Sequence, residues 1–150
     1  MEFSEATKIL ILLSNNFDEN SLPVTPAKLR NIIALLNEKD ISLGELTSQN
    51  HKLLLEIESK VGLDKDQITH QLSYGMRLAL KIDEWKNLGI WCISTLDIEQ
   101  FPLKLLSKAR QKINPLLFGS GELSILSKPS VGIVGSRDIN ENTLQYVHKA

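Results

Sequence analysis

A short turn near the end of the printed sequence carries the residue types best suited to binding an anion. It reads Gly135-Ser136-Arg137 and directly follows the apolar run of residues 131–134. A buried strand that ends in glycine and turns at once into a helix leaves several backbone N–H groups available for an anion. Ser136 would add a hydroxyl donor, and the Arg137 guanidinium can hold a phosphate through two parallel hydrogen bonds. The turn is therefore a candidate phosphate-binding site.

A purely structural role explains these residues equally well when they are taken alone. Gly135 would then allow a tight turn, Asp138 would be an ordinary helix N-cap, and Arg137 would be solvated. The glycine spacing matches neither a dinucleotide-binding fingerprint nor a P-loop. Both interpretations stay open at this stage.

A second candidate lies upstream, where four basic residues fall within nine positions: Lys104, Lys108, Arg110 and Lys112. Lys104 and Lys108 are one helical turn apart and could follow a nucleic-acid backbone, each phosphate contact making binding more sensitive to salt. The alternative is the solvated face of an amphipathic helix, which is the more common use of clustered lysines.

No combination of residues in the chain is typical of catalysis. Ser136 lacks the Gly-x-Ser-x-Gly surroundings of an activated nucleophile. Two pairs of neighbouring carboxylates fit a helix cap and a solvated helix face better than acid–base chemistry, namely Asp64 with Asp66 and Asp83 with Glu84. We therefore expect a non-enzymatic protein that uses no cofactor.

The histidines and the cysteine do not form a metal-binding pattern. His51, His70 and His148 are far apart in sequence, and one cysteine cannot build a zinc knuckle. Because Cys92 is the only cysteine, no intramolecular disulfide can form, which favours a reducing compartment. The first apolar run, residues 9–13, is too short to span a bilayer. These features predict a cytoplasmic protein without membrane contact.

Aromatic side chains can stack on unpaired bases, so their positions also bear on function. Tyr74 and Trp85 fall at apolar positions of a predicted helix, and Trp91 and Phe118 fall in predicted strands. Core packing is the interpretation that we prefer for these four. Tyr146 is the expected exposed exception.

The first 88 residues are predicted to be helical. Apolar residues recur there every three to four positions in four segments, namely residues 6–13, 26–36, 49–60 and 64–88, and residues 41–46 are predicted to form a short turn or helical piece. Thr25 and Asp64 are expected N-caps, and Gly62 and Gly89 are expected C-terminal stops.

After Gly89 the helical periodicity gives way to short apolar runs. Strands are predicted at residues 89–95, 116–118 and 130–137, with a turn into a helix over residues 96–109 and a helix over residues 138–150. Alternation of strands and helices is typical of a parallel α/β sheet. The sequence thus predicts an α+β chain, with an all-helical domain over residues 1–88 and the first part of a parallel α/β domain over residues 89–150.

Composition and charge limit the range of functions. With 42% hydrophobic and 23% charged residues among 150, the chain can bury a core as one domain or two small ones. Lys and Arg number 10 against 13 Asp and Glu in residues 1–89, and 7 against 5 in residues 90–150. Because the net charge is only −1, any site for a polyanion must be local.

Three segments of the second half, in their order and spacing, resemble the DNA-processing protein A family (DprA, also called Smf). They are GIWCISTLDIEQFPLKLL, INPLLFGSGELSIL and SVGIVGSRD. In that family a Gly-Ile strand precedes an Asp…Tyr-Pro-x-x-Leu segment and a Pro-x-x-Leu-x-x-x-Gly strand. A Val-x-Ile-Val-Gly-Ser-Arg strand then opens an extended Rossmann-like fold. The resemblance covers residues 89–138.

The resemblance implies a helical, SAM-like N-terminal domain followed by a Rossmann-like domain. It also implies single-stranded DNA binding without chemistry and loading of a RecA-type recombinase during natural transformation. Carried over by position, Gly135, Ser136 and Arg137 fall on the family's phosphate-binding turn. Phe101 stands where the family has tyrosine. A second glycine-rich segment of the family has no counterpart before Ala150, so we expect this chain to be the N-terminal portion of a longer protein.

Two other classes of function stay open on the sequence. A nucleotide-handling enzyme, such as a nucleotide glycosidase, uses similar glycine-rich turns on a related fold, and its carboxylates would lie beyond Ala150. Release of a free base from a nucleoside monophosphate would favour it. The helical half could instead be a protein-interaction module that binds a recombinase or forms a homodimer.

Overall fold

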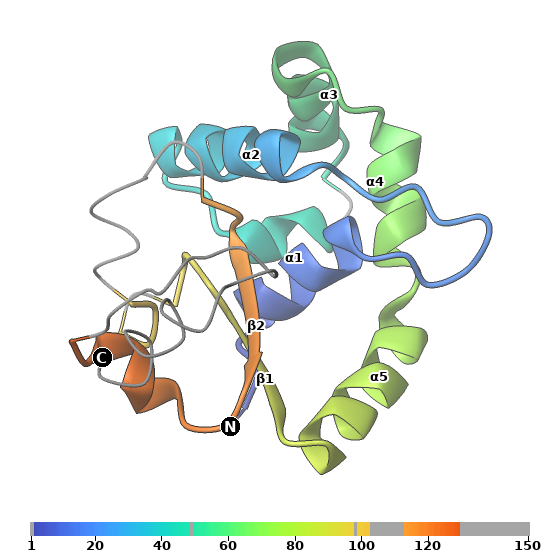
Figure 1. The fold of residues 1–150 in the computed structure, drawn as a ribbon. Coiled ribbons are helices and arrows are strands. Elements are labelled where there is room, and N and C mark those ends of the chain that lie inside the picture. The colour runs from blue at the N-terminus through green and yellow to red at the C-terminus, as the bar shows by residue number, and fades with distance from the viewer. Residues whose placement is uncertain (1, 49, 98, 103–112, 130–150) are drawn as a thin grey trace, which may run out of the picture.

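The computed structural model describes residues 2–48, 50–97, 99–102 and 113–129 (Figure 1). Helical elements come first and a pair of strands follows. In chain order they are α1 (Glu5–Ser14), α2 (Pro26–Glu38), η1 (Leu43–Leu46), α3 (His51–Val61), α4 (Lys65–Leu72), α5 (Gly75–Asn87), β1 (Ile90–Ser94), β2 (Leu116–Ser120) and η2 (Leu123–Ser127). The change from helices to strands therefore occurs where the periodicity of the sequence changes.

The helix boundaries confirm the predicted caps. The Thr25 hydroxyl accepts a hydrogen bond from Lys28 N at 3.4 Å and opens α2. The Asp64 carboxylate accepts one from Asp66 N at 2.7 Å and opens α4, so this carboxylate pair is a helix cap. Gly62 closes α3 with a φ of 67°, a left-handed conformation that favours glycine.

The single long helix predicted over residues 64–88 is wrong, because α4 and α5 are separate helices. The backbone turns between them, where Tyr74 N donates to Gln71 O at 3.3 Å and the Ser73 hydroxyl donates to His70 O at 2.6 Å. Serine competes for backbone hydrogen bonds in this way and favours helix ends. The break turns α5 so that Leu78 is buried and Met76 is exposed.

The expected parallel sheet is also wrong for the two strands that the structure describes. β1 pairs with β2 in antiparallel register, from Ile90 opposite Ser120 to Ser94 opposite Leu116. A parallel pair would require the chain to cross over to the far end of the sheet. Instead the chain returns at the end where β1 finishes, and Thr95 N donates to Pro115 O at 2.9 Å. The third strand and the last helix lie outside the described residues, so the Rossmann-like fold stays a prediction.

The core is centred on α1, which Figure 1 shows between α2, α4, α5 and the strands. All five residues from Ile9 to Leu13 are buried, so α1 is apolar on every side, as expected for an interior helix. Cys92 of β1 and Leu116 of β2 belong to the same hydrophobic cluster as the helices. The predicted domain boundary near Gly89 stays a prediction, although side chains from both sides of it share this cluster. No helix in the described part of the chain is long and apolar enough to cross a membrane.

Candidate functional site

All six residues predicted to bind phosphate lie outside the described residues, namely Gly135, Ser136, Arg137, Lys104, Lys108 and Lys112. Tyr146 lies outside them too. The structure nevertheless describes the residues on both sides of the basic segment 103–112, and these show how that segment is attached to the core.

Both ends of segment 103–112 are fixed to the framework. On its N-terminal side the backbone N–H groups of Gln100 and Phe101 donate to Asp97 O at 2.9 and 2.8 Å, and the Phe101 ring is buried. On its C-terminal side Arg30 of α2 donates from Nη1 to Ile113 O at 3.1 Å. The residues that precede and follow the basic segment are therefore bonded to the turn after β1 and to α2.

The Asp97 carboxylate links the turn after β1 to the central helix. Its Oδ2 accepts hydrogen bonds from Thr7 Oγ1 at 2.5 Å, from Ser94 N at 2.7 Å and from Ser94 Oγ at 2.9 Å. Thr7 and Ser94 are both fully buried. The bond between Asp97 and Thr7 spans 90 residues of sequence, so local residue patterns do not indicate it.

These hydrogen bonds keep Asp97 ionised. Burial alone would raise the pKa of the carboxyl, but hydrogen bonds from Ser4, Thr7 and Ser94 prevail and hold the pKa below its ordinary value of 3.8. An ionised carboxylate that already accepts several hydrogen bonds is poorly suited to acid–base catalysis. Burial, together with the Asp97 charge, raises the pKa of the Cys92 thiol to about 12, so this cysteine is an unreactive core residue.

The substitution Asp97→Asn is expected to lower the free energy of unfolding by about 1 to 2 kcal/mol at pH 7, a range reduced for solvent screening. Because the folded-state pKa is depressed, the carboxylate stabilises the protein above about pH 4. That contribution is lost as the pH falls through the folded-state pKa. Urea unfolding at several pH values should therefore show the difference from the wild type shrinking below about pH 4. The exposed control Glu99→Gln should have little effect, and a pH-independent loss in Asp97→Asn would contradict the charge-based explanation.

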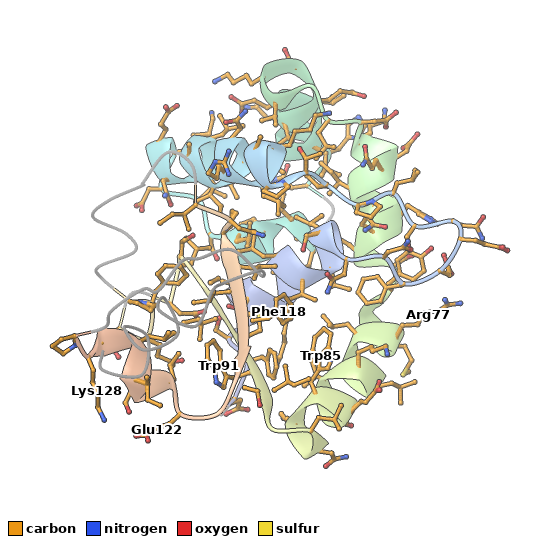
Figure 2. All side chains as sticks on the ribbon, in the orientation of Figure 1. Arg77, Trp85, Trp91, Phe118, Glu122 and Lys128 are labelled. Atoms are coloured by element: carbon orange, nitrogen blue, oxygen red, sulfur yellow. The ribbon has the colours of Figure 1, made fainter. Side chains whose placement is uncertain are left out.

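The aromatic side chains partly follow the prediction of core packing. Tyr74 is buried, and Trp85 is half-buried with its ring centroid 6.2 Å from that of Phe3. The prediction is wrong for Phe118, which is 41% exposed. Phe118 is the middle residue of β2, and its ring meets that of Trp85 edge to face, with centroids 5.4 Å apart (Figure 2). Its apolar sequence context gave no indication of this position at the margin of the core.

Trp91 occupies the strand face opposite to that of Cys92. Its ring lies across Gly119, the residue paired with it on β2, and its Nε1 donates to Gly121 O at 2.9 Å. The ring lines an open depression of about 610 Å³, whose other lining residues include Glu2 and Lys86. Since these two charges are opposite, the depression has no excess positive charge with which to attract phosphate.

The other candidate catalytic and metal-binding residues that the structure describes are exposed or contact neighbouring side chains and backbone. Asp83 and Glu84 are exposed on α5, and Glu84 forms an ion pair with Lys81 at 2.9 Å. His70 Nε2 lies 3.1 Å from the Tyr74 hydroxyl and 3.1 Å from Asn20 O. Within the described ranges, no group of three His, Cys, Asp or Glu residues could hold a metal ion.

Comparison with known proteins places the second part of the chain in a family. Residues 92–150 match the family model described as DNA recombination-mediator protein A. The matched range contains Asp97, β2, the basic segment and the predicted phosphate turn. Neither a curated protein nor a solved structure matches the chain. The match agrees with the resemblance seen in the residue pattern and supports assignment of residues 92–150 to the DNA recombination-mediator protein A (DprA) family.

Proposed function

We propose that this protein binds single-stranded DNA and loads a RecA-type recombinase onto it during DNA uptake, without catalysing a reaction. The observation that carries the proposal is the family match over residues 92–150, because it includes the Gly135-Ser136-Arg137 turn. DNA recombination is the process that the family description names. The buried, protonated Cys92 thiol fits our proposal that the protein works in the cytoplasm.

The proposed contact is with the phosphate backbone rather than with the bases. Backbone N–H groups of the turn would donate to a phosphate, Ser136 would add its hydroxyl, and Arg137 would supply the positive charge. Lys104, Lys108 and Lys112 would add attraction that depends on salt. Such binding is independent of sequence, as a protein that accepts incoming DNA of any origin requires.

The described framework supports this role because the residues on either side of the basic segment are bonded to it. Arg30 fixes Ile113 at one end, and the turn at Asp97 fixes Phe101 at the other. Asp97 in turn is bonded to α1, so the helices act as a scaffold for the proposed site.

Fluorescence anisotropy of a labelled single-stranded oligonucleotide tests the proposal. The substitution Arg137→Ala is expected to weaken binding about tenfold at low salt, because it removes one charged phosphate contact. It should also reduce the slope of log affinity against log salt by about 0.7. Unlabelled duplex should compete more weakly than an unlabelled single strand. Lys52→Ala, which removes an exposed positive charge from α3, is the matched control and should leave the affinity unchanged.

Equal affinity of the wild type and Arg137→Ala at low salt would contradict the assignment of the phosphate site. A recombinase assay tests the second half of the proposal, since a RecA-type recombinase should form filaments on single-stranded DNA sooner when this protein is present. Release of a free base from a nucleoside monophosphate would instead establish an enzyme.

A further inference from the structure

The Trp91 indole is held in one position, with one of its faces turned away from the strands. A Cβ on Gly119 would overlap Cη2 and Cζ2 of the ring and would lie 2.9 Å from Cε2. Overlap with these consecutive ring atoms places Gly119 beneath a face of the indole rather than at its edge. Nε1 donates to Gly121 O at 2.9 Å, which fixes the rotation of the ring. The indole is therefore a fixed planar surface whose second face points away from β2.

The surface of the ring that Gly119 leaves uncovered borders the open depression of about 610 Å³. Leu123 adds apolar lining, and Glu2 and Lys86 are the charged residues of the depression. Figure 2 shows Trp91 and Trp85 on opposite sides of the strand pair, so the depression is separate from the aromatic contacts of Trp85. Pockets of about 300 to 1,000 Å³ hold small ligands, so this one has room for a planar ring.

The charges of the depression fit a neutral planar ligand with polar edges. The Glu2 carboxylate accepts hydrogen bonds and the Lys86 ammonium donates them. Both side chains are exposed, and neither bonds to another residue in the part of the chain that the structure describes. A nucleobase carries no charge, has an aromatic face for stacking and presents donors and acceptors at its edge. Of the parts of a nucleic acid, the depression therefore suits a base and not a phosphate.

We propose that Trp91 is a stacking platform for one base of bound single-stranded DNA. The inference rests on the proposed function and deepens it, because phosphate contacts at residues 135–137 would leave the bases free. Every base has an aromatic face, so stacking adds affinity without adding sequence preference. The family match begins at residue 92, so the platform is a feature of this chain that the family assignment does not supply.

Stacking on Trp91 would also favour single strands over duplex. Bases within a duplex already stack on their neighbours and must be unstacked before a protein ring can replace one of them. Single-stranded DNA has free base faces, so it alone gains the contact at no such cost.

Oligonucleotides with and without bases separate this contact from the phosphate site. One labelled probe is oligo(dT), and the other is an abasic deoxyribose-phosphate strand of equal length, which carries the same backbone charge. The wild type should bind oligo(dT) about tenfold more tightly than the abasic strand, as expected for one stacked base. Trp91→Leu should bind the two strands about equally. Fluorescence anisotropy at low salt measures both affinities.

Three further variants serve as controls. Trp91→Phe keeps an aromatic face and should restore most of the preference for oligo(dT). Trp85→Phe changes the tryptophan that packs on Phe118 on the other side of the strands, and the preference should persist. Arg137→Ala should weaken binding of both strands by the same factor, because a phosphate contact does not depend on the base. Thermal unfolding of each variant verifies that it is folded.

Quenching of tryptophan emission tests the contact without replacing Trp91. The chain has two tryptophans, so the emission of Trp85→Phe comes from Trp91 alone. Oligo(dT) should quench this emission, whereas the abasic strand should leave it nearly unchanged.

The outcomes distinguish this inference from the proposed function. A preference for oligo(dT) that persists in Trp91→Leu overturns the inference, as does Trp91 emission that oligo(dT) does not quench at saturation. The phosphate site at residues 135–137 would survive both of these results. A protein that binds neither strand overturns both proposals.

Discussion

Replacement of Gln71 by glutamate is expected to lower the free energy of unfolding by about 3 to 5 kcal/mol at pH 7, because it places a buried carboxylate against carbonyl oxygens with Leu22 N as its one backbone donor. The Gln71 side chain is fully buried, and its Nε2 donates to Leu12 O and to Asn15 O, each at 3.1 Å. Its Oε1 accepts from Leu22 N at 3.0 Å. A carboxylate has the same shape but no N–H to offer the two carbonyl oxygens. Urea unfolding at pH 7 would measure the loss.

The effect is large because these carbonyl groups lie at or just beyond the last turn of α1. Carbonyl groups at a helix end have no partner within their own helix and must find donors elsewhere. Gln71 reaches from α4 to supply them, and it also holds the backbone of Leu22, so one buried amide secures both α1 and the loop that follows it. No buried side-chain nitrogen or oxygen in the described part of the chain lacks a hydrogen-bond partner.

Two further variants separate charge from lost hydrogen bonds. Gln71→Leu removes the donors and the acceptor without adding a charge, so its loss should be smaller, at about 2 to 3 kcal/mol. Gln67→Glu changes the same residue type in the same helix, where Nε2 donates to Leu22 O at an exposed position, and should cost less than about 1 kcal/mol. A Gln71→Glu variant as stable as Gln67→Glu would contradict the assigned role.

The substitution Gly119→Ala is expected to lower the free energy of unfolding by about 2 to 3 kcal/mol. A Cβ at this position would overlap Cη2 and Cζ2 of Trp91 and would lie 2.9 Å from its Cε2. Because the neighbouring atoms belong to a rigid ring, the indole must leave its place and release its hydrogen bond to Gly121 O. Denaturant unfolding measures the loss, and loss of the near-ultraviolet signal of Trp91 would report the displaced ring.

A double-mutant cycle tests the origin of that loss. In a Trp91→Ala background the obstruction is absent, so adding Gly119→Ala should be neutral or slightly stabilising, since alanine restricts the unfolded chain more than glycine. Gly75→Ala is a matched control, because nothing lies within 4 Å of its added Cβ and it opens α5. It should stabilise the protein by about 0.5 to 1 kcal/mol. An equal loss from Gly119→Ala in both backgrounds would rule out the contact with Trp91 as the cause.

Local features of the chain could be predicted from the sequence, because they depend on residues close to one another. Thr25, Asp64 and Gly62 mark helix ends through hydrogen bonds or backbone angles within a few positions, and all three were predicted. The apolar runs predicted strands at residues 89–95 and 116–118. The structure has strands at Ile90–Ser94 and Leu116–Ser120. The order and spacing of three sequence segments likewise indicated the family whose model matches residues 92–150.

The tertiary structure decided everything that depends on contacts between distant residues. The antiparallel pairing of β1 and β2 follows from the path of the chain between them, which local periodicity does not contain. In the sequence Gln71 is an ordinary polar helix residue, and its role depends on α1 packing beside it. Gly119 is required only because the strand register places Trp91 opposite it. The sequence by itself determined the caps and most of the helices, the two strands and the family pattern, since each is recorded in neighbouring residues. Only the fold determined the break between α4 and α5, strand direction, and the roles of Asp97 and Gln71, because these depend on how the chain packs.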